Sequence, residues 1–142
     1  MNYAEALNEF SGPSTEVYEA LNIIRDRAGI PSVQEAWTNT AYAATPNKHT
    51  TKDGLREIIR QERMIELAFE GHRYYDIRRW KLAEQYFSTP IQGWSVDEES
   101  ESNYYQIMEV SPRSFNSPRD YLQPIIFEEL SRNPNLIQNP GW

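Results

Sequence analysis

The sequence contains no cysteine among its 142 residues. A disulfide, a thiolate metal site and a thiol nucleophile are therefore all excluded. The chain also has few cations, because 14 Lys and Arg stand against 21 Asp and Glu, for a net charge of −7. This balance argues against general nucleic-acid binding, which needs a basic surface.

Long apolar runs are missing as well. No stretch approaches the ~18 apolar residues of a membrane-spanning helix, and the opening MNYAEA lacks the basic and apolar regions of a signal peptide. Only 39% of the residues are hydrophobic, on a count that includes tyrosine. A typical globular domain has about 45–50% apolar residues, on a count that includes glycine and leaves out tyrosine. We therefore expect the chain to close a core with difficulty when alone and to pack against a further segment.

Signatures of catalysis are scarce. The serines lack a Gly-x-Ser-x-Gly elbow, and there is no glycine-rich phosphate loop. A di-metal helical bundle needs Glu-x-x-His pairs, but His72 follows Glu70 by only two residues, across Gly71, and His49 falls in an expected loop. We therefore expect no cofactor, no metal site and no enzymatic activity.

What the sequence does contain is helical periodicity. Apolar residues at spacings of 4, 3 and 4 from Val17 onward predict a helix over about 14–29. Two further patterns predict helices over about 51–70 and 72–87, joined by a tight turn at Gly71. We expect a mainly α fold with this helical hairpin at its core.

The other residues show little regularity. Residues 31–50 read as a long loop with one short helical turn. Residues 88–142 read as an irregular, proline-punctuated tail with one short extended segment near 104–110 and one helical turn near 127–131. The tail still holds many apolar residues, which disordered tails lack. We therefore expect an ordered tail that wraps the helical body.

The densest charged run covers residues 60–80. Glu62, Glu66 and Glu70 are four apart, so they stack on one helix face and repel one another unless arginines or a metal neutralise them. Eleven of the 14 basic residues are arginine, which suits fixed ion pairs, whereas glycoside hydrolysis needs carboxyls facing each other across a cleft. We favour a structural ion network between the second and third helices over a catalytic site. Its predicted members are Glu62, Glu66, Glu70, Arg73, Asp76, Arg78 and Arg79.

Glu62 is the critical member, because it falls within the apolar row of its helix. A buried carboxylate that loses its partner costs roughly 3–5 kcal/mol. We therefore predict an arginine partner for Glu62, from the set Arg73, Arg78 and Arg79.

Aromatic side chains in the expected loops are the candidates for ligand binding. Flat rings can stack on sugar faces while nearby amides and carboxylates bind the hydroxyl groups. The alternative is that the rings pack the tail onto the helices, since buried aromatic area is strongly stabilising. The candidates are Trp37, Tyr42, Trp94, Tyr104 and Tyr105.

Four stretches, taken in order, resemble the C-terminal part of the SusD/RagB family. The first is LNIIRDRAGIP at 21–31, and the second includes ELAFEGHR and DIRRW within 55–80. The third combines PRSF and PRDYLQP within 112–124, and the last is NPNLIQNPGW at 133–142. Each is modest alone, but together they are specific.

This resemblance implies a mostly helical fold and a role in nutrient binding at the cell surface. Members of the family are outer-membrane lipoproteins that hand oligosaccharides or similar nutrients to a SusC-like TonB-dependent transporter, without cleaving them. They also carry an N-terminal half with tetratricopeptide-like helices, a signal peptide and a lipidated cysteine. We therefore expect this chain to be the final portion of a longer protein.

Two functions stay open at this point. The first is non-catalytic binding of a glycan or other nutrient, although no ligand residue can be matched by motif and the aromatic candidates rest on residue type alone. The second is a helical protein-interaction module that never touches sugar. An enzyme with a carboxylate site is the least favoured interpretation.

Overall fold

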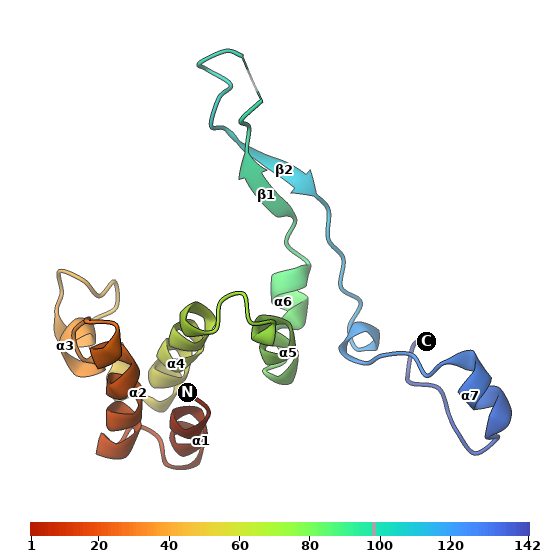
Figure 1. Cartoon of the computed structure of the whole chain (residues 1–142), viewed down its shortest axis with the longest axis horizontal. Helices are drawn as coiled ribbons and strands as arrows, with labels where there is room; N and C mark the ends of the chain where they lie inside the picture. Colours follow the sequence, from red (N-terminus) through yellow and green to blue (C-terminus); the bar gives the residue numbers. More distant parts are fainter. Residues whose placement is uncertain (98) are drawn as a thin grey trace. The chain divides into compact units, whose positions relative to one another are not determined.

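The structure is a computed structural model that describes residues 1–97 and 99–142 (Figure 1). The chain divides into two compact units, residues 1–71 and residues 72–142. The described elements are mostly helices, with one two-stranded sheet in the second unit. The prediction of a mainly α fold is therefore confirmed.

The first unit is built from helices alone. Its elements are α1 Asn2–Ser11, α2 Thr15–Arg27, α3 Val33–Thr38, the 3-10 turn η1 Lys48–Thr50 and α4 Lys52–Glu66. Helices α2 and α4 match two of the predicted helices, and α3 matches the predicted helical turn. Helix α1 was not predicted, because its buried face carries the polar Asn8 and no side chain caps its first turn.

Side-chain caps explain where three of these helices begin. The Ser14 hydroxyl accepts a hydrogen bond from the backbone N–H three residues later, at the start of α2. Ser32 and Glu35 form a reciprocal capping box on α3, and the Thr51 hydroxyl accepts from the Gly54 N–H at 3.1 Å on α4. Such caps satisfy N–H groups that have no partner within the helix.

The core of the first unit draws on all four α-helices. Its fully buried members are Ala4, Val17, Leu21, Val33, Leu55, Ile58 and Ile59. The sequence placed the core on the hairpin of residues 51–87, whereas here α1, α2 and α3 each contribute to it. A buried polar contact adds to this packing, because the Tyr18 hydroxyl donates to the His49 carbonyl at 3.0 Å.

Two predicted helix boundaries are wrong. Helix α4 ends at Glu66 and not near residue 70, and the left-handed φ of Phe69 (66°) interrupts the chain two residues before Gly71. The predicted helix over 72–87 is two helices, α5 His72–Arg79 and α6 Ala83–Phe87, which begin the second unit. Lys81 has a φ of 58° between them, a conformation that no α-helix continues.

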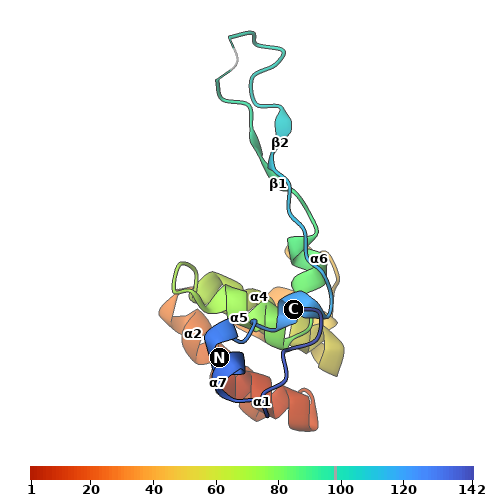
Figure 2. The same cartoon turned by 90° about the vertical axis from the view of Figure 1, so that its right-hand side faces the viewer.

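The region predicted to be irregular contains a β-hairpin. Strand β1 Ile91–Trp94 pairs antiparallel with β2 Ile107–Ser111, and Trp94 lies opposite Ile107. Figures 1 and 2 both show this hairpin running away from α6, with its loop at the far end. The sequence predicted one short extended segment here and missed β1.

The rest of the second unit is ordered by polar contacts. It contains the 3-10 turn η2 Arg119–Tyr121 and α7 Phe127–Arg132. Gln138 and Ile125 exchange two hydrogen bonds, of 2.9 and 3.0 Å, through the amide side chain of Gln138. The Trp142 indole N–H donates to the Arg119 carbonyl at 3.1 Å, so the chain end returns to η2.

Candidate functional site

Three exposed aromatic side chains gather on the β-hairpin. Trp94 and Tyr105 meet edge to face with ring centroids 6.2 Å apart, and Tyr104 meets Tyr105 at 4.4 Å. We call these three residues the hairpin aromatic cluster. The sequence proposed each of them separately, and the structure brings them together.

The backbone of the hairpin explains why these rings meet. Trp94 is the last residue of β1, and Ser95 continues the pairing because its N–H donates to the Gln106 carbonyl at 2.9 Å. The Ser95 hydroxyl accepts a hydrogen bond from the Gln106 N–H at 3.0 Å. The Ser95 backbone carbonyl accepts from the Tyr105 N–H, also at 3.0 Å. Tyr105 itself has a left-handed φ of 58°. This tight closure places the rings where the strands end and the loop begins.

The cluster leaves much of its ring surface open. Trp94 is 58% exposed, Tyr105 62% and Tyr104 39%. Rings with open surface, here inclined at 88° and 61° to one another, are able to stack on the apolar face of a flat ligand.

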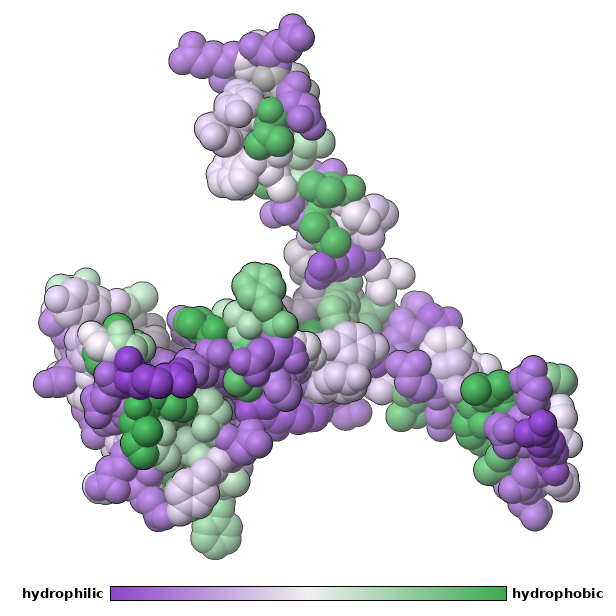
Figure 3. Space-filling view, in the orientation of Figure 1, coloured by the Kyte–Doolittle hydropathy of each residue, from purple (hydrophilic) through white to green (hydrophobic). Residues whose placement is uncertain are grey.

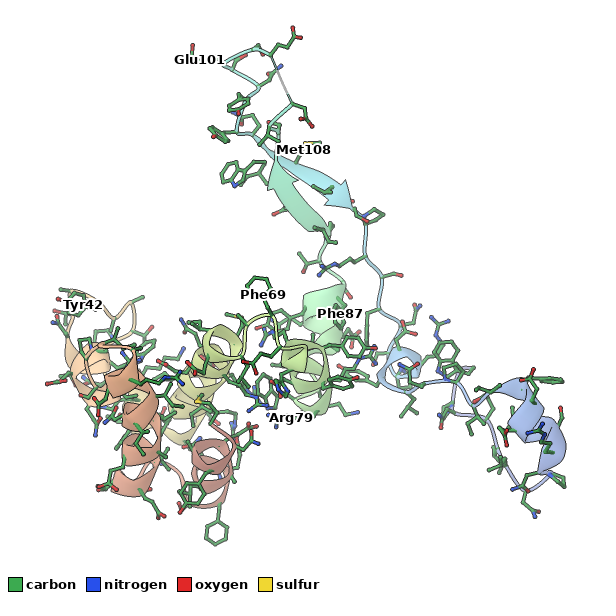
Figure 4. The ribbon with its side chains drawn as sticks, in the orientation of Figure 1. Tyr42, Phe69, Arg79, Phe87, Glu101 and Met108 are labelled. Atoms are coloured by element: carbon green, nitrogen blue, oxygen red, sulfur yellow. The ribbon has the colours of Figure 1, made fainter. Side chains whose placement is uncertain are left out.

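The other two aromatic candidates lie in the first unit. Trp37 is half-buried against the core, and the Lys48 ammonium group lies 5.6 Å from the centroid of its ring. Tyr42 is 75% exposed on the loop after α3, where Figure 4 labels it. Trp37 therefore has a packing role, and a ligand-binding role for either residue stays a prediction.

The predicted partner of Glu62 is wrong. Glu62 pairs with Arg25 of α2, and not with an arginine from the set 73, 78 and 79. Both side chains are largely buried, at 9% exposure for Arg25 and 19% for Glu62, and the Arg25 Nε also donates to the Pro31 carbonyl at 2.6 Å. Glu66 likewise pairs with Arg27. The pairs thus hold α2 to α4. Because Arg25 and Glu62 are 37 residues apart in the sequence, helical periodicity could not indicate that they pair.

The remaining charged residues of the predicted network make other contacts. Asp76 pairs with Arg79 at 2.9 Å within α5. The Arg73 guanidinium lies 4.6 Å from the Tyr86 ring centroid. That these residues share one network with Glu62, Glu66, Glu70 and Arg78 stays a prediction.

A groove in the second unit is a feature that the sequence did not reveal. It has a volume of about 440 Å³ and lies between α5, α6 and the segment that follows β2. We call it the arginine–aromatic groove. The residues that define it are Tyr74, Arg78, Phe87, Arg113, Phe115 and Asp120. About 40 positions separate its two sides in the sequence, so no local pattern joins them.

Residues 1–97 and 99–142 contain neither a cluster of metal-binding side chains nor a helix suited to a membrane. No group of three or more His, Asp or Glu residues there could hold a metal ion. None of the helices described has the length and apolar character to cross a membrane.

Comparison with known proteins gives consistent matches along the chain. The sequence profile of the SusD family matches residues 1–142. SusD-like protein P2 of Formosa agariphila is 37% identical over 140 residues, which is 98% of this chain and 23% of that protein. SusD-like protein P38 of the same organism is 30% identical over 136 residues, covering 96% of this chain and 21% of that protein.

Solved structures give the same result. A SusD-like protein from Bacteroides fragilis superimposes with a TM-score of 0.74 at 33% identity, over 99% of this chain and 24% of that one. A SusD-like carbohydrate binding protein from the same organism has a TM-score of 0.69 at 34% identity, over 95% of this chain and 26% of that one. The chain thus spans about a quarter of the length of the proteins that it matches.

Proposed function

This chain belongs to the SusD family, and from that premise we propose that it binds oligosaccharides or related nutrients without cleaving them. The proposed setting is the outer surface of the outer membrane, as part of a longer protein that delivers its ligand to a SusC-like TonB-dependent transporter. Family membership supports the general role, and the similarity to a SusD-like carbohydrate binding protein supports the ligand class.

The observation that carries the proposal is the hairpin aromatic cluster. Three exposed rings at one end of a short sheet offer ring faces of different orientation on which the flat, apolar faces of sugar rings can stack. The adjoining loop also carries exposed polar side chains, such as that of Asn103, that are able to bind hydroxyl groups. Each contact of this kind is weak, so binding is reversible, as delivery to a transporter requires.

Affinity electrophoresis tests the proposal. The 142-residue chain is run through native gels that contain a panel of neutral polysaccharides, together with Trp94→Ala and Tyr105→Ala. We expect at least one polysaccharide to retard the chain and each substitution to reduce the retardation about tenfold in apparent affinity, which corresponds to ~1.4 kcal/mol. Phe127→Ala is the matched control, because Phe127 is a 78% exposed aromatic on α7, outside the cluster. Equal retardation of Trp94→Ala and the unsubstituted chain would contradict the proposal.

A second candidate function is docking to another protein. The hairpin exposes the apolar residues Ile107 (64%), Met108 (49%) and Val110 (62%), and Figure 3 shows green, hydrophobic patches along the hairpin. Exposed apolar edges of a two-stranded sheet are able to pair with a further chain. Capture of a β-barrel from outer membranes, lost in Met108→Lys and retained in Trp94→Ala, would favour this function over sugar binding.

A further inference from the structure

We propose that the arginine–aromatic groove binds the carboxylate of an acidic sugar, such as a uronic acid unit in an oligosaccharide. This inference rests on the proposed function and narrows its ligand class. Its basis is the combination of a guanidinium with one unpartnered N–H, a second cation and apolar walls in one groove of the second unit.

The groove has the size and lining of a ligand site. Its volume of about 440 Å³ falls within the roughly 300–1,000 Å³ of small-molecule pockets. Phe87 and Phe115 both line it and stack on each other, with ring centroids 5.9 Å apart and an interplanar angle of 27°, and Figure 4 labels Phe87 on α6. These rings supply the apolar wall on which a sugar ring can rest.

Arg78 supplies the proposed anchor for the anion. Its Nη1 donates to the backbone carbonyl of Asp120, and the Tyr74 ring centroid lies 4.2 Å from its guanidinium carbon. Its Nε is buried and has no hydrogen-bond acceptor among the described residues. A buried cationic donor without an acceptor is energetically unfavourable. The acceptor that suits a guanidinium best is a carboxylate, whose oxygens can accept from two of its N–H groups.

The other charged groups at the groove favour an anion. Arg113 lines it and makes no ion pair among the residues described. The Asp120 carboxylate is hydrogen-bonded elsewhere, because its oxygens accept from the Arg119 Nε and from the Asn116 N–H, each at 2.7 Å, and the charge of Arg78 acts on it through space. The Arg119 hydrogen bond holds the pKa of Asp120 below its ordinary value. Asp120 therefore stays a fixed, already paired anion.

The charge of the whole chain makes this site specific. With a net charge of −7, the chain has no general attraction for polyanions, and its overall field opposes their approach. Binding of an acidic oligosaccharide would thus require a local cationic site. The groove offers one, with two guanidinium groups beside aromatic walls.

Calorimetric titration with tetragalacturonate tests the inference, and its methyl ester is the matched neutral ligand. We expect the acid to bind about tenfold or more tightly than the ester, with an affinity that falls as salt rises. Arg113→Gln is the first variant, because Arg113 is exposed and removing it leaves no buried partner. It should weaken binding of the acid about tenfold and leave the ester unchanged.

Two further variants complete the design. Arg78→Gln should abolish the preference for the acid, with circular dichroism reporting whether the second unit stays folded. Arg132→Gln removes the same charge from α7, where Arg132 pairs with Glu129 and is 75% exposed, and should change nothing. An equal loss in Arg132→Gln and Arg113→Gln would overturn the inference, since it would show that only overall charge matters.

The remaining outcomes separate this inference from the proposed function. If neutral polysaccharides retard the chain but the acid and ester bind equally, the groove assignment fails and the proposed function stands. If a sulfated oligosaccharide binds through Arg113 and the uronate does not, the carboxylate assignment is refuted. Uronate binding that survives Trp94→Ala but not Arg113→Gln supports the groove as a site separate from the hairpin aromatic cluster. Absence of all glycan binding refutes both.

Discussion

Replacing Glu62 by glutamine removes the negative charge from the buried pair that joins α2 to α4. The Arg25 side chain is only 9% exposed, and it is further fixed by its hydrogen bond to the Pro31 carbonyl. In Glu62→Gln the guanidinium therefore stays buried without its counter-charge. Breaking a buried pair in this way costs roughly 3–5 kcal/mol.

Glutamine retains one oxygen that can accept a hydrogen bond from Arg25, so we expect a smaller cost than that range, about 2–3 kcal/mol. Because a unit of this size loses about 4–8 °C of melting temperature per kcal/mol, the first unit should melt roughly 10–20 °C earlier. Urea unfolding gives the free energy of unfolding directly. Hydrogen exchange of the α2 and α4 amides reports on this unit without interference from the second one.

The matched control is Glu129→Gln, which removes a carboxylate from the exposed pair with Arg132. Those side chains are 54% and 75% exposed, and exposed pairs contribute about 0–1 kcal/mol. If Glu62→Gln lowers stability no more than this control does, the reasoning about a buried ion pair is refuted. In a double-mutant cycle, Arg25→Met combined with Glu62→Leu should be more stable than Glu62→Leu alone, because no unpaired charge then remains buried.

Three other predictions concern the first unit. A Cβ added at Gly54 would lie 2.0 Å from the Lys48 carbonyl oxygen, so Gly54→Ala should lower the free energy of unfolding by about 1–3 kcal/mol; unchanged urea unfolding would contradict the close approach. Ser32→Ala removes the capping box of α3 and should cost about 1 kcal/mol, with faster amide exchange confined to the first turn of that helix. Burial lowers the pKa of His49 from its ordinary 6.5, so the unfolded chain binds a proton that the folded unit excludes. The contribution of neutral His49 to the free energy of unfolding is then fully present above pH 6.5 and is lost as the pH falls through the folded pKa. His49→Gln should flatten this decline in the free energy of unfolding, measured by urea unfolding at several pH values. An equal slope of that free energy against pH in both proteins would exclude His49 as its source.

The sequence identified features that depend on nearby residues. The apolar stripe from Val17 locates α2 to within a few residues, and the pattern over 51–70 locates the start of α4, since helix periodicity acts over three or four positions. The family resemblance rested on ordered motifs along one chain and is confirmed by a profile match over residues 1–142. The break at Lys81 was missed because neither glycine nor proline marks it.

The partners of these residues were decided by the tertiary structure. Arg25 meets Glu62 across 37 positions, Phe87 of α6 stacks on Phe115 of the segment after β2, and Trp94 meets Tyr105 only because two strands pair. Such contacts depend on how elements pack and on which register a hairpin takes, and neither is recorded in the spacing of residues along one helix. From the sequence alone, α2, the helical turn at α3, the start of α4, the absence of cysteine chemistry and the family could be predicted. Packing decided which arginine neutralises which carboxylate and which rings form a surface.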